Sequence, residues 1–217
     1  MSSFHFLEQR DNKDKEKEKN KWIQNDSSST QTLLFATVFL GSSIGKGIYA
    51  EVASDLGSKL AKNQIGIVYG GTDVGCMGKL AEAAYENNGT VIGIFPRELL
   101  NSEVSHNHVK YTNISELILV DTMQQRKKML SDRGDFIIVL PGGTGTFEEF
   151  FDIVSEIKWT GHAKPIYVVN IDGYYDPLKL LFQNAVENGF LLPHYKLFNY
   201  VNTIDELFEI VKSDFEL

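Results

Sequence analysis

Short apolar runs alternate with amphipathic stretches along this chain from residue 33 onward. The runs are mostly continuous and rich in β-branched residues, which is typical of parallel strands covered on both faces. They lie at 33–40, 65–69, 91–95, 117–120, 136–140 and 166–170. The amphipathic stretches repeat their apolar positions at helical spacing. They lie at 49–62, 77–87, 123–133, 147–159, 177–188 and 204–213.

This alternation of strands and helices predicts an α/β fold, a three-layer, Rossmann-like open parallel sheet with helices on both faces. Ligands of such sheets bind beyond the carboxyl ends of the strands. The chain has 217 residues, of which 42% are hydrophobic, enough to bury one sizeable core. We therefore expect residues 32–217 to form a single domain.

Residues 1–31 have a different composition. Lysine alternates with acidic residues and Asn at 11–21, and 25–30 is a polar linker with nothing to bury. We expect this N-terminal arm to be disordered; the alternative is a helix that packs on a partner subunit. The arm lacks the apolar segment of a secretory signal, and no run in the chain approaches membrane-spanning length. These features predict a cytoplasmic protein without membrane association.

Charge and cysteine content narrow the choice of ligand. The formal net charge is −8 and the isoelectric point is about 5.1, so nucleic acid is not an expected partner. A single cysteine, Cys76, excludes an internal disulfide and the usual cysteine-based zinc sites. A small molecule held by local geometry fits this composition best.

The segment 140–149, with the sequence LPGGTGTFEE, joins a predicted strand to a predicted helix through a glycine-rich turn. Its glycines let a ligand approach the backbone, and the following helix presents free N–H groups and the positive end of its dipole. A phosphate is the ligand that such a turn favours. The alternative is a capping box between Thr146 and Glu149. Glu148 and Glu149 would repel a phosphate unless one of them has another task, such as contacting a ribose.

Two further glycine clusters follow predicted strands. Gly41 and Ser42 end the first strand, and Gly70 and Gly71 end the second. In the predicted fold both clusters converge with the 140–149 turn on one crevice; the alternative is that they only form tight strand-to-helix turns. Their spacing matches neither a P-loop nor the dinucleotide-binding motif, which disfavours ATP hydrolysis and NAD binding.

Arg126 lies in the first turn of the helix predicted at 123–133, which Asp121 or Thr122 caps. From that turn its planar guanidinium can reach the crevice and bind a phosphate or a purine nitrogen. The alternative is a solvated charged helix face.

Several segments together resemble the signature of the LONELY GUY family, the cytokinin riboside 5′-monophosphate phosphoribohydrolases. They are YGG at 69–71, GCMG at 75–78, RK at 126–127 and PGGTGTFEE at 141–149. The resemblance extends over about 38–190 and includes 162–165, 170–178 and 187–190. It implies hydrolysis of the N-glycosidic bond of a nucleoside 5′-monophosphate to free base and ribose 5-phosphate, without a metal or other cofactor. Members also carry the name lysine decarboxylase, but no residue here marks a pyridoxal phosphate lysine.

The resemblance implies that Arg126 and Glu149 form the catalytic pair and that Lys127 is a neighbouring substrate contact. It also implies substrate contacts for Glu103, Ser155 and the turn residues Gly143, Thr144, Gly145, Thr146 and Glu148. In this interpretation Glu149 stabilises the positive charge that develops on the ribose or orients the attacking water, and Arg126 stabilises the leaving base.

The chain departs from the family pattern at three positions. Gln124 and Gln125 replace the usual His-Glu pair before Arg126, and Thr72 replaces a third glycine. These changes bear on substrate choice and activity but leave the catalytic pair intact. His106 and His108 have metal-like spacing in a loop without partner ligands, so we expect them to face solvent, and no metal site is predicted.

We therefore expect a phosphoribohydrolase acting on AMP or N6-substituted AMP, as a homodimer with its crevice near the interface. An apolar excess on 147–159 supports the dimer, through Phe150, Phe151, Val154 and Trp159. The alternatives are a broad purine-nucleotide nucleosidase of salvage and a nucleotide-binding or carrier module without turnover. A pure binder would not need both an arginine and a glutamate at the crevice.

Overall fold

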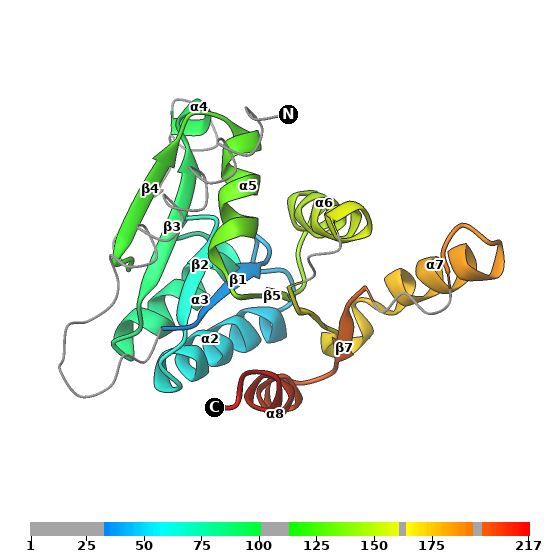
Figure 1. The fold of residues 1–217 in the computed structure, drawn as a ribbon. Helices are drawn as coiled ribbons and strands as arrows, with labels where there is room; N and C mark the ends of the chain where they lie inside the picture. Colours follow the sequence, from blue (N-terminus) through cyan, green and yellow to red (C-terminus); the bar gives the residue numbers. More distant parts are fainter. Residues whose placement is uncertain (1–32, 101–112, 161–163, 193–196) are drawn as a thin grey trace. The chain divides into compact units, whose positions relative to one another are not determined.

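Seven parallel strands form one sheet within the residues that the computed structural model describes, which are 33–100, 113–160, 164–192 and 197–217. The strands lie in the order β4-β3-β2-β1-β5-β6-β7 (Figure 1). Their bounds are β1 (Phe35–Phe39), β2 (Gly66–Tyr69), β3 (Val91–Pro96), β4 (Glu116–Val120), β5 (Phe136–Val139), β6 (Ile166–Val169) and β7 (Asn199–Val201). The arm at 1–31 lies outside the described residues, so its disorder and the domain boundary after it stay predictions.

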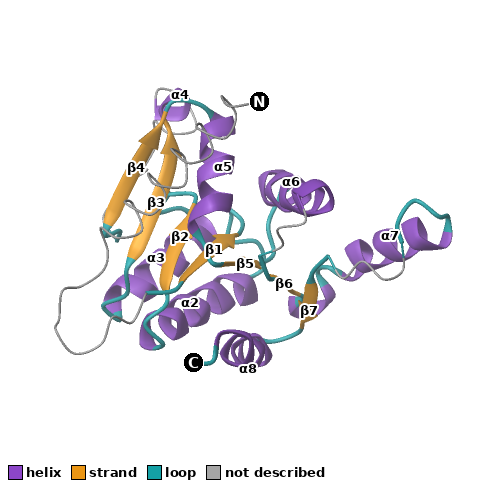
Figure 2. Ribbon diagram, viewed as in Figure 1, coloured by secondary structure: helices purple, strands orange, loops and turns teal. Residues whose placement is uncertain are grey.

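Helices cover both faces of this sheet (Figure 2). On one face lie α2 (Gly47–Lys62), α3 (Gly75–Glu86) and α8 (Ile204–Phe215), and on the other lie α5 (Met123–Arg133) and α6 (Thr144–Thr160) (Figure 1). The chain also forms α4 (Arg97–Leu100), the 3₁₀ helix η1 (Ile171–Gly173) and α7 (Asp176–Glu187). The predicted three-layer, Rossmann-like parallel sheet is confirmed. Within the described ranges, no helix is both long and apolar enough to cross a membrane.

Burial explains which strands the sequence pattern could predict. Every residue of β1, β2, β3, β5 and β6 is buried, so each strand reads as a continuous apolar run. The pattern did not predict β7, a three-residue strand that pairs with β6 at the edge of the sheet. Its three residues, of which only Val201 is buried, are too few to form an apolar run or an alternation.

The strand order creates a switch point between β1 and β5. The chain runs from β1 through β2 and β3 to β4, and α5 then returns it to the other side of β1, where β5 pairs. Ligands of open α/β sheets bind at the carboxyl ends of such a strand pair. The turns after these two strands touch, because the Gly41 N–H donates to the Pro141 carbonyl oxygen at 3.2 Å. The fold therefore brings the first glycine cluster to the 140–149 turn, as predicted.

Candidate active site

The turn from β5 to α6 is tightly packed at its start. A Cβ atom on Gly142 would lie 2.1 Å from Thr146 Oγ1 and 2.8 Å from the Gly41 nitrogen. A Cβ on Gly41 would in turn lie 3.3 Å from Gly142 Cα. Packing explains why position 142 is glycine, and the close approach at Gly41 agrees with the tight-turn alternative for the first glycine cluster.

Gly143 and Gly145 have no such constraint. Both are exposed, neither has a positive φ, and a Cβ on either would meet no atom within 4 Å. The absence of their side chains leaves open space over the N-terminus of α6, where helix N–H groups and the dipole favour an anion. Access for a ligand accounts for these two glycines, whereas packing does not.

Helix α6 begins at Thr144, earlier than the predicted residue 147. The Phe147 N–H donates to the Gly143 carbonyl oxygen at 3.0 Å, so Thr146 lies inside the first helical turn and not at the N-cap. The capping-box alternative for Thr146 and Glu149 is therefore wrong. Thr144 is exposed beside the turn, whereas Thr146 is only 4% exposed.

A different capping box begins α5. Thr122 is the N-cap, and its hydroxyl accepts from the Gln125 N–H at 3.2 Å. The Gln125 Oε1 accepts from the backbone N–H groups of Asp121 at 2.9 Å and Thr122 at 3.3 Å. Glutamate and glutamine both serve in such a box. The departure from the family pattern at Gln125 therefore keeps the start of α5 and the position of Arg126.

The structure brings Arg126 and Glu149 together at the carboxyl edge of the sheet. Arg126 Nη1 donates to Glu149 Oε1 at 2.9 Å, and Arg126 Nε donates to the Ile94 carbonyl oxygen at 3.2 Å. The two side chains are 11% and 7% exposed. Gly70 provides the space for this guanidinium, since a Cβ on Gly70 would lie 2.4 Å from Arg126 Nη2.

Burial sets the electrostatics of Glu149. Removal from water raises the pKa of this carboxyl above its ordinary value of 4.5, and the charge and hydrogen bond of Arg126 oppose part of that rise. Titratable groups perturbed in this way at a crevice are candidates for catalysis.

Lys127 and Glu148 make a second, more exposed connection between α5 and α6. Lys127 Nζ lies 2.6 Å from Asp152 Oδ2 and 2.9 Å from Glu148 Oε1. The hydrogen bond with Asp152 raises the pKa of Lys127 most, and the hydrogen bond with Glu148 raises it further. Ser155 is exposed and lies six residues beyond Glu149 on α6, so the two side chains leave the helix in different directions.

The remaining predicted residues lie around the same sheet edge. Gly71 has a φ of +80°, and a Cβ there would lie 3.1 Å from the Ile94 nitrogen. Ser42 is exposed, and its carbonyl oxygen lies 2.2 Å from the place of a Cβ on Gly75, so the turn after β1 packs on the start of α3. Close packing of the backbone therefore accounts for the glycines at positions 71 and 75.

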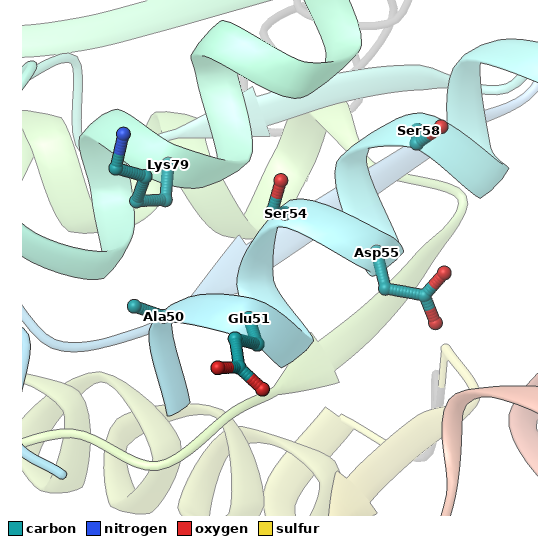
Figure 3. Close-up of a pocket in the computed structure, with 6 residues that line it drawn as sticks. All are labelled: Ala50, Glu51, Ser54, Asp55, Ser58 and Lys79. Atoms are coloured by element: carbon teal, nitrogen blue, oxygen red, sulfur yellow. The ribbon is translucent and has the colours of Figure 1, made fainter. Parts of the chain in front are cut away.

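Not every residue singled out in the sequence lies in the part of the chain that the structure describes. Glu103, His106 and His108 lie outside the described residues, so their roles stay predictions. In the described part of the chain, no group of three or more His, Cys, Asp and Glu residues is placed to hold a metal ion. A cavity of about 550 Å³ lies over α2 and α3 (Figure 3) and contains none of the predicted site residues. Its lining consists of Ala50, Glu51, Ser54, Asp55, Ser58 and Lys79.

Sequence reasoning missed two tyrosines that contact the turn. The Tyr174 hydroxyl donates to the Gly142 carbonyl oxygen, and the Tyr175 hydroxyl donates to the Leu140 carbonyl oxygen at 2.8 Å. Both lie in the segment 170–178, which supported the family resemblance without a role for any of its residues. The sequence signal that could have pointed to them is the pair of adjacent tyrosines directly after Gly173.

Known proteins with similar sequences agree with the family resemblance seen in the sequence. Residues 77–213 match the model of a protein family described as "Possible lysine decarboxylase". The chain is 40% identical over 157 residues to the probable cytokinin riboside 5′-monophosphate phosphoribohydrolase LOGL2 of Oryza sativa subsp. japonica, an alignment that covers 72% of this chain and 62% of the rice protein. It is 38% identical over 158 residues to the cytokinin riboside 5′-monophosphate phosphoribohydrolase of Rhodococcoides fascians, covering 72% of this chain and 78% of that protein.

Among solved structures, a molybdenum cofactor binding protein from Rippkaea orientalis has the same fold, with a TM-score of 0.64. The match covers 86% of this chain and 99% of that one at 19% sequence identity. At this level of identity the likeness concerns the fold alone.

Proposed function

The chain belongs to the LONELY GUY family of cytokinin riboside 5′-monophosphate phosphoribohydrolases, and from this premise we propose that it hydrolyses the N-glycosidic bond of AMP or N6-substituted AMP. The products are the free base and ribose 5-phosphate. The observation that carries the proposal is the enclosed Arg126–Glu149 pair beside the open glycine turn of α6.

The 5′-phosphate binds at the N-terminus of α6 in this proposal. The open space over Gly143 and Gly145 gives it access to the backbone, and the exposed Thr144 adds a hydroxyl donor. Because the chain has a net charge of −8, local N–H groups and the helix dipole must attract the phosphate. Binding energy from the phosphate then positions the ribose for reaction.

Glu149 acts at the reacting carbon. Cleavage of the bond between C1′ and the base nitrogen builds positive charge on the ribose, which the enclosed carboxylate stabilises while it orients the attacking water. The water oxygen bonds to C1′, and the base departs with the electron pair of the broken bond. One water proton passes through Glu149 to the base nitrogen, a transfer that its raised pKa favours.

Arg126 acts on the leaving base. Its contacts with the Ile94 carbonyl and Glu149 fix the plane of the guanidinium. Because arginine keeps its charge in proteins, Arg126 stabilises the negative charge on the departing base electrostatically. The same ion pair holds the Glu149 carboxylate in place.

The description of the family as lysine decarboxylases does not fit this site. Decarboxylation of that kind requires a lysine that forms a Schiff base with pyridoxal phosphate. Lys127 is bound by Asp152 and Glu148, which raise its pKa and keep it protonated. Glu148 thus has a task of its own, which answers how a second carboxylate is tolerated beside a phosphate.

The direct test is base release by the purified full-length protein. AMP and isopentenyladenosine monophosphate should yield free base and ribose 5-phosphate, and chromatography measures both products. Addition of a chelator should not lower the rate. Adenosine should be a far poorer substrate, because it lacks the phosphate. Equal rates on AMP and adenosine would rule out the phosphate site, and no base from any purine monophosphate would favour a binding or carrier module.

A panel of nucleotides distinguishes a cytokinin-activating enzyme from a broad nucleosidase of purine salvage. A higher kcat/KM for N6-substituted AMP than for AMP would indicate cytokinin activation. Similar values for AMP, GMP and IMP would indicate a broad nucleosidase of purine salvage.

A cytoplasmic homodimer is also part of the proposal, on a surface that shares only Phe151 with the expected one. Phe150 and Val154 are buried, at 2% and 7% exposure, so neither faces a partner. The side chain of Trp159 lies outside the described residues. The exposed large apolar residues of this region are Phe147 and Phe151 on α6 with Leu180, Leu181, Phe190 and Leu192 on and after α7.

This α6–α7 surface is a candidate dimer interface, because large exposed apolar groups mark association sites. Phe151 of α6 stacks on Phe182 of α7, with ring centroids 6.2 Å apart, so the two helices contribute to one surface. Light scattering at micromolar concentration should give a dimer mass, both for the full chain and after deletion of residues 1–30. A monomer mass, or loss of the dimer on deletion of the arm, would contradict this assignment.

A further inference from the structure

We propose that Tyr174 is a positioning residue that aims the Gly143 N–H at the substrate phosphate, an inference that rests on the proposed function. Its hydroxyl donates to the Gly142 carbonyl oxygen. That carbonyl and the Gly143 N–H belong to one trans peptide unit, so they point in opposite directions. A donor that fixes the carbonyl therefore fixes the N–H.

The whole turn is held in this way. Each of the four consecutive carbonyl groups from Leu140 to Gly143 accepts a hydrogen bond from its own donor. The donors are, in order, the Tyr175 hydroxyl at 2.8 Å, the Gly41 N–H at 3.2 Å, the Tyr174 hydroxyl and the Phe147 N–H at 3.0 Å. No peptide plane of the turn can rotate without breaking one of these bonds. The N–H groups are thus pre-organised for an anion before it binds.

Tyr174 is itself fixed from several sides. Its ring packs edge-on against Tyr49 of α2, with centroids 5.6 Å apart, and against Tyr175, at 4.9 Å. The backbone before it adopts left-handed angles at Asp172 and Gly173, with φ of 52° and 69°, which turn the chain toward β5. Burial raises the pKa of Tyr174, so its hydroxyl stays protonated and remains a donor at neutral pH.

The neighbouring Tyr175 provides a matched control. Its hydroxyl makes the same kind of hydrogen bond, to the carbonyl of Leu140. The nitrogen of that peptide belongs to Pro141 and carries no hydrogen. Tyr175 therefore holds the backbone without aiming any N–H group, whereas Tyr174 does both.

The experiment compares Tyr174→Phe with Tyr175→Phe, each of which removes one hydroxyl from the full-length chain. Calorimetry measures binding of AMP, ribose 5-phosphate and adenosine, and steady-state assays measure KM and kcat. We expect Tyr174→Phe to weaken AMP and ribose 5-phosphate binding about two- to tenfold, the size of one hydrogen bond. Adenosine binding should not change, because adenosine has no phosphate for the Gly143 N–H to contact. Tyr175→Phe should lower the melting temperature and weaken AMP binding less than Tyr174→Phe does, because its hydrogen bond aims no N–H group.

The outcomes separate this inference from the proposed function. Tyr174-dependent AMP binding without base release would support the positioning role and overturn the hydrolase. Equal loss of AMP affinity in both variants, or in neither, would overturn the positioning role even if base is released. A parallel loss of AMP and adenosine binding in Tyr174→Phe would overturn it too, because a general structural defect affects both. A wild-type protein that binds no AMP would overturn both proposals.

Discussion

The site has an enclosed half and an open half, built from neighbouring residues of the same two helices. Arg126 of α5 and Glu149 of α6 are 11% and 7% exposed, whereas the adjacent Lys127 and Glu148 are 15% and 56% exposed. Both are ion pairs with N···O distances of 2.9 Å. Successive residues of a helix point about 100° apart. One turn of each helix can therefore supply both a pair withdrawn from water and a pair that joins the helices at the surface.

The difference in burial gives the two pairs different environments, which suit the different tasks proposed for them. Charges interact far more strongly where water is excluded, and a carboxylate there costs more to ionise. Glu149 therefore has the environment that the chemistry of charge development requires. Glu148, in contact with solvent and Lys127, has the environment of a tether.

The largest effect is expected from matched amide substitutions of the two glutamates. Glu149→Gln should lower kcat by about 10²-fold or more, since it removes the charge that stabilises the ribose. Glu148→Gln should stay within severalfold of wild type, because an exposed ion pair contributes little. Initial rates of base release from AMP measure both, with circular dichroism as the check on folding.

Two results would contradict this comparison. A Glu149→Gln protein that remains folded and active would show that Glu149 has only a structural role. Equal loss in both variants would show that the enclosed and open halves do not differ in function. If Glu149→Gln unfolds because Arg126 is left unpaired, Glu149→Asp tests the position of the charge instead. It keeps the carboxylate but draws it back by one methylene, so a folded Glu149→Asp protein with full activity would contradict a role at the reacting carbon.

The glycines of the turn provide the second test of the comparison. Gly142→Ala should destabilise the protein by about 1–3 kcal/mol, because its Cβ would meet Thr146 Oγ1 at 2.1 Å and the Gly41 nitrogen at 2.8 Å. Gly145→Ala should stabilise it by up to about 1 kcal/mol, because alanine favours the helix and meets no atom within 4 Å. Gly145→Ala should nevertheless raise KM for AMP, since the methyl group occupies the proposed phosphate space.

Denaturant unfolding and AMP kinetics of the two variants check this prediction. A Gly145→Ala protein that is more stable and has an unchanged KM would show that the open space is not a ligand site.

The sequence pattern was sufficient to predict the fold, whereas the pairing of Arg126 with Glu149 was implied by the family resemblance. Doubly covered parallel strands leave a continuous apolar signature, and their order places the residues after β1, β2 and β5 at one edge. Such a pattern gives the end of the sheet at which a residue lies, but not how deeply its side chain is buried. The enclosure of Arg126 depends on Gly70 and on the Ile94 carbonyl, which are distant in sequence.

Local patterns were ambiguous where two mechanisms share one motif. Thr146 and Glu149 have capping-box spacing, yet the functioning box is that of Thr122 and Gln125, in the segment where the chain departs from its family. The helix start at Thr144 rules out the box at Thr146, and the turn just before it packs Gly142 against Gly41. That contact joins residues about a hundred positions apart, which one-dimensional spacing cannot show.

A smaller effect is expected for the coupling within each pair. A double-mutant cycle with Arg126→Met and Glu149→Gln should give a coupling free energy of about 1–3 kcal/mol, as expected of contacting groups enclosed from water. The cycle with Lys127→Met and Glu148→Gln should give about 0.2–1 kcal/mol, because Glu148 is largely exposed. Urea unfolding at low and high salt measures both cycles, and only the exposed pair should weaken markedly with salt. Equal coupling energies would mean that burial does not separate the two halves.

The smallest effect concerns pH, and it decides whether burial or pairing dominates at Glu149. Burial raises its pKa above 4.5 in the folded protein, so the folded state keeps the proton to higher pH than the unfolded chain does. The stabilisation from this group is complete below pH 4.5 and is lost as pH rises through the folded pKa. The free energy of unfolding of wild type, relative to Glu149→Gln, should therefore fall as pH rises through that window.

Chemical denaturation at a series of pH values measures this difference. Arg126→Met is the matched control, because it removes the charge that opposes the rise in pKa and should move the window to higher pH. If the advantage of wild type instead grew with pH, the ion pair would outweigh desolvation and the folded pKa would lie below 4.5. Glu149 would then stay ionised, and it would stabilise charge without carrying a proton to the base. The enclosed half would differ from the open half only in the strength of its electrostatic interactions.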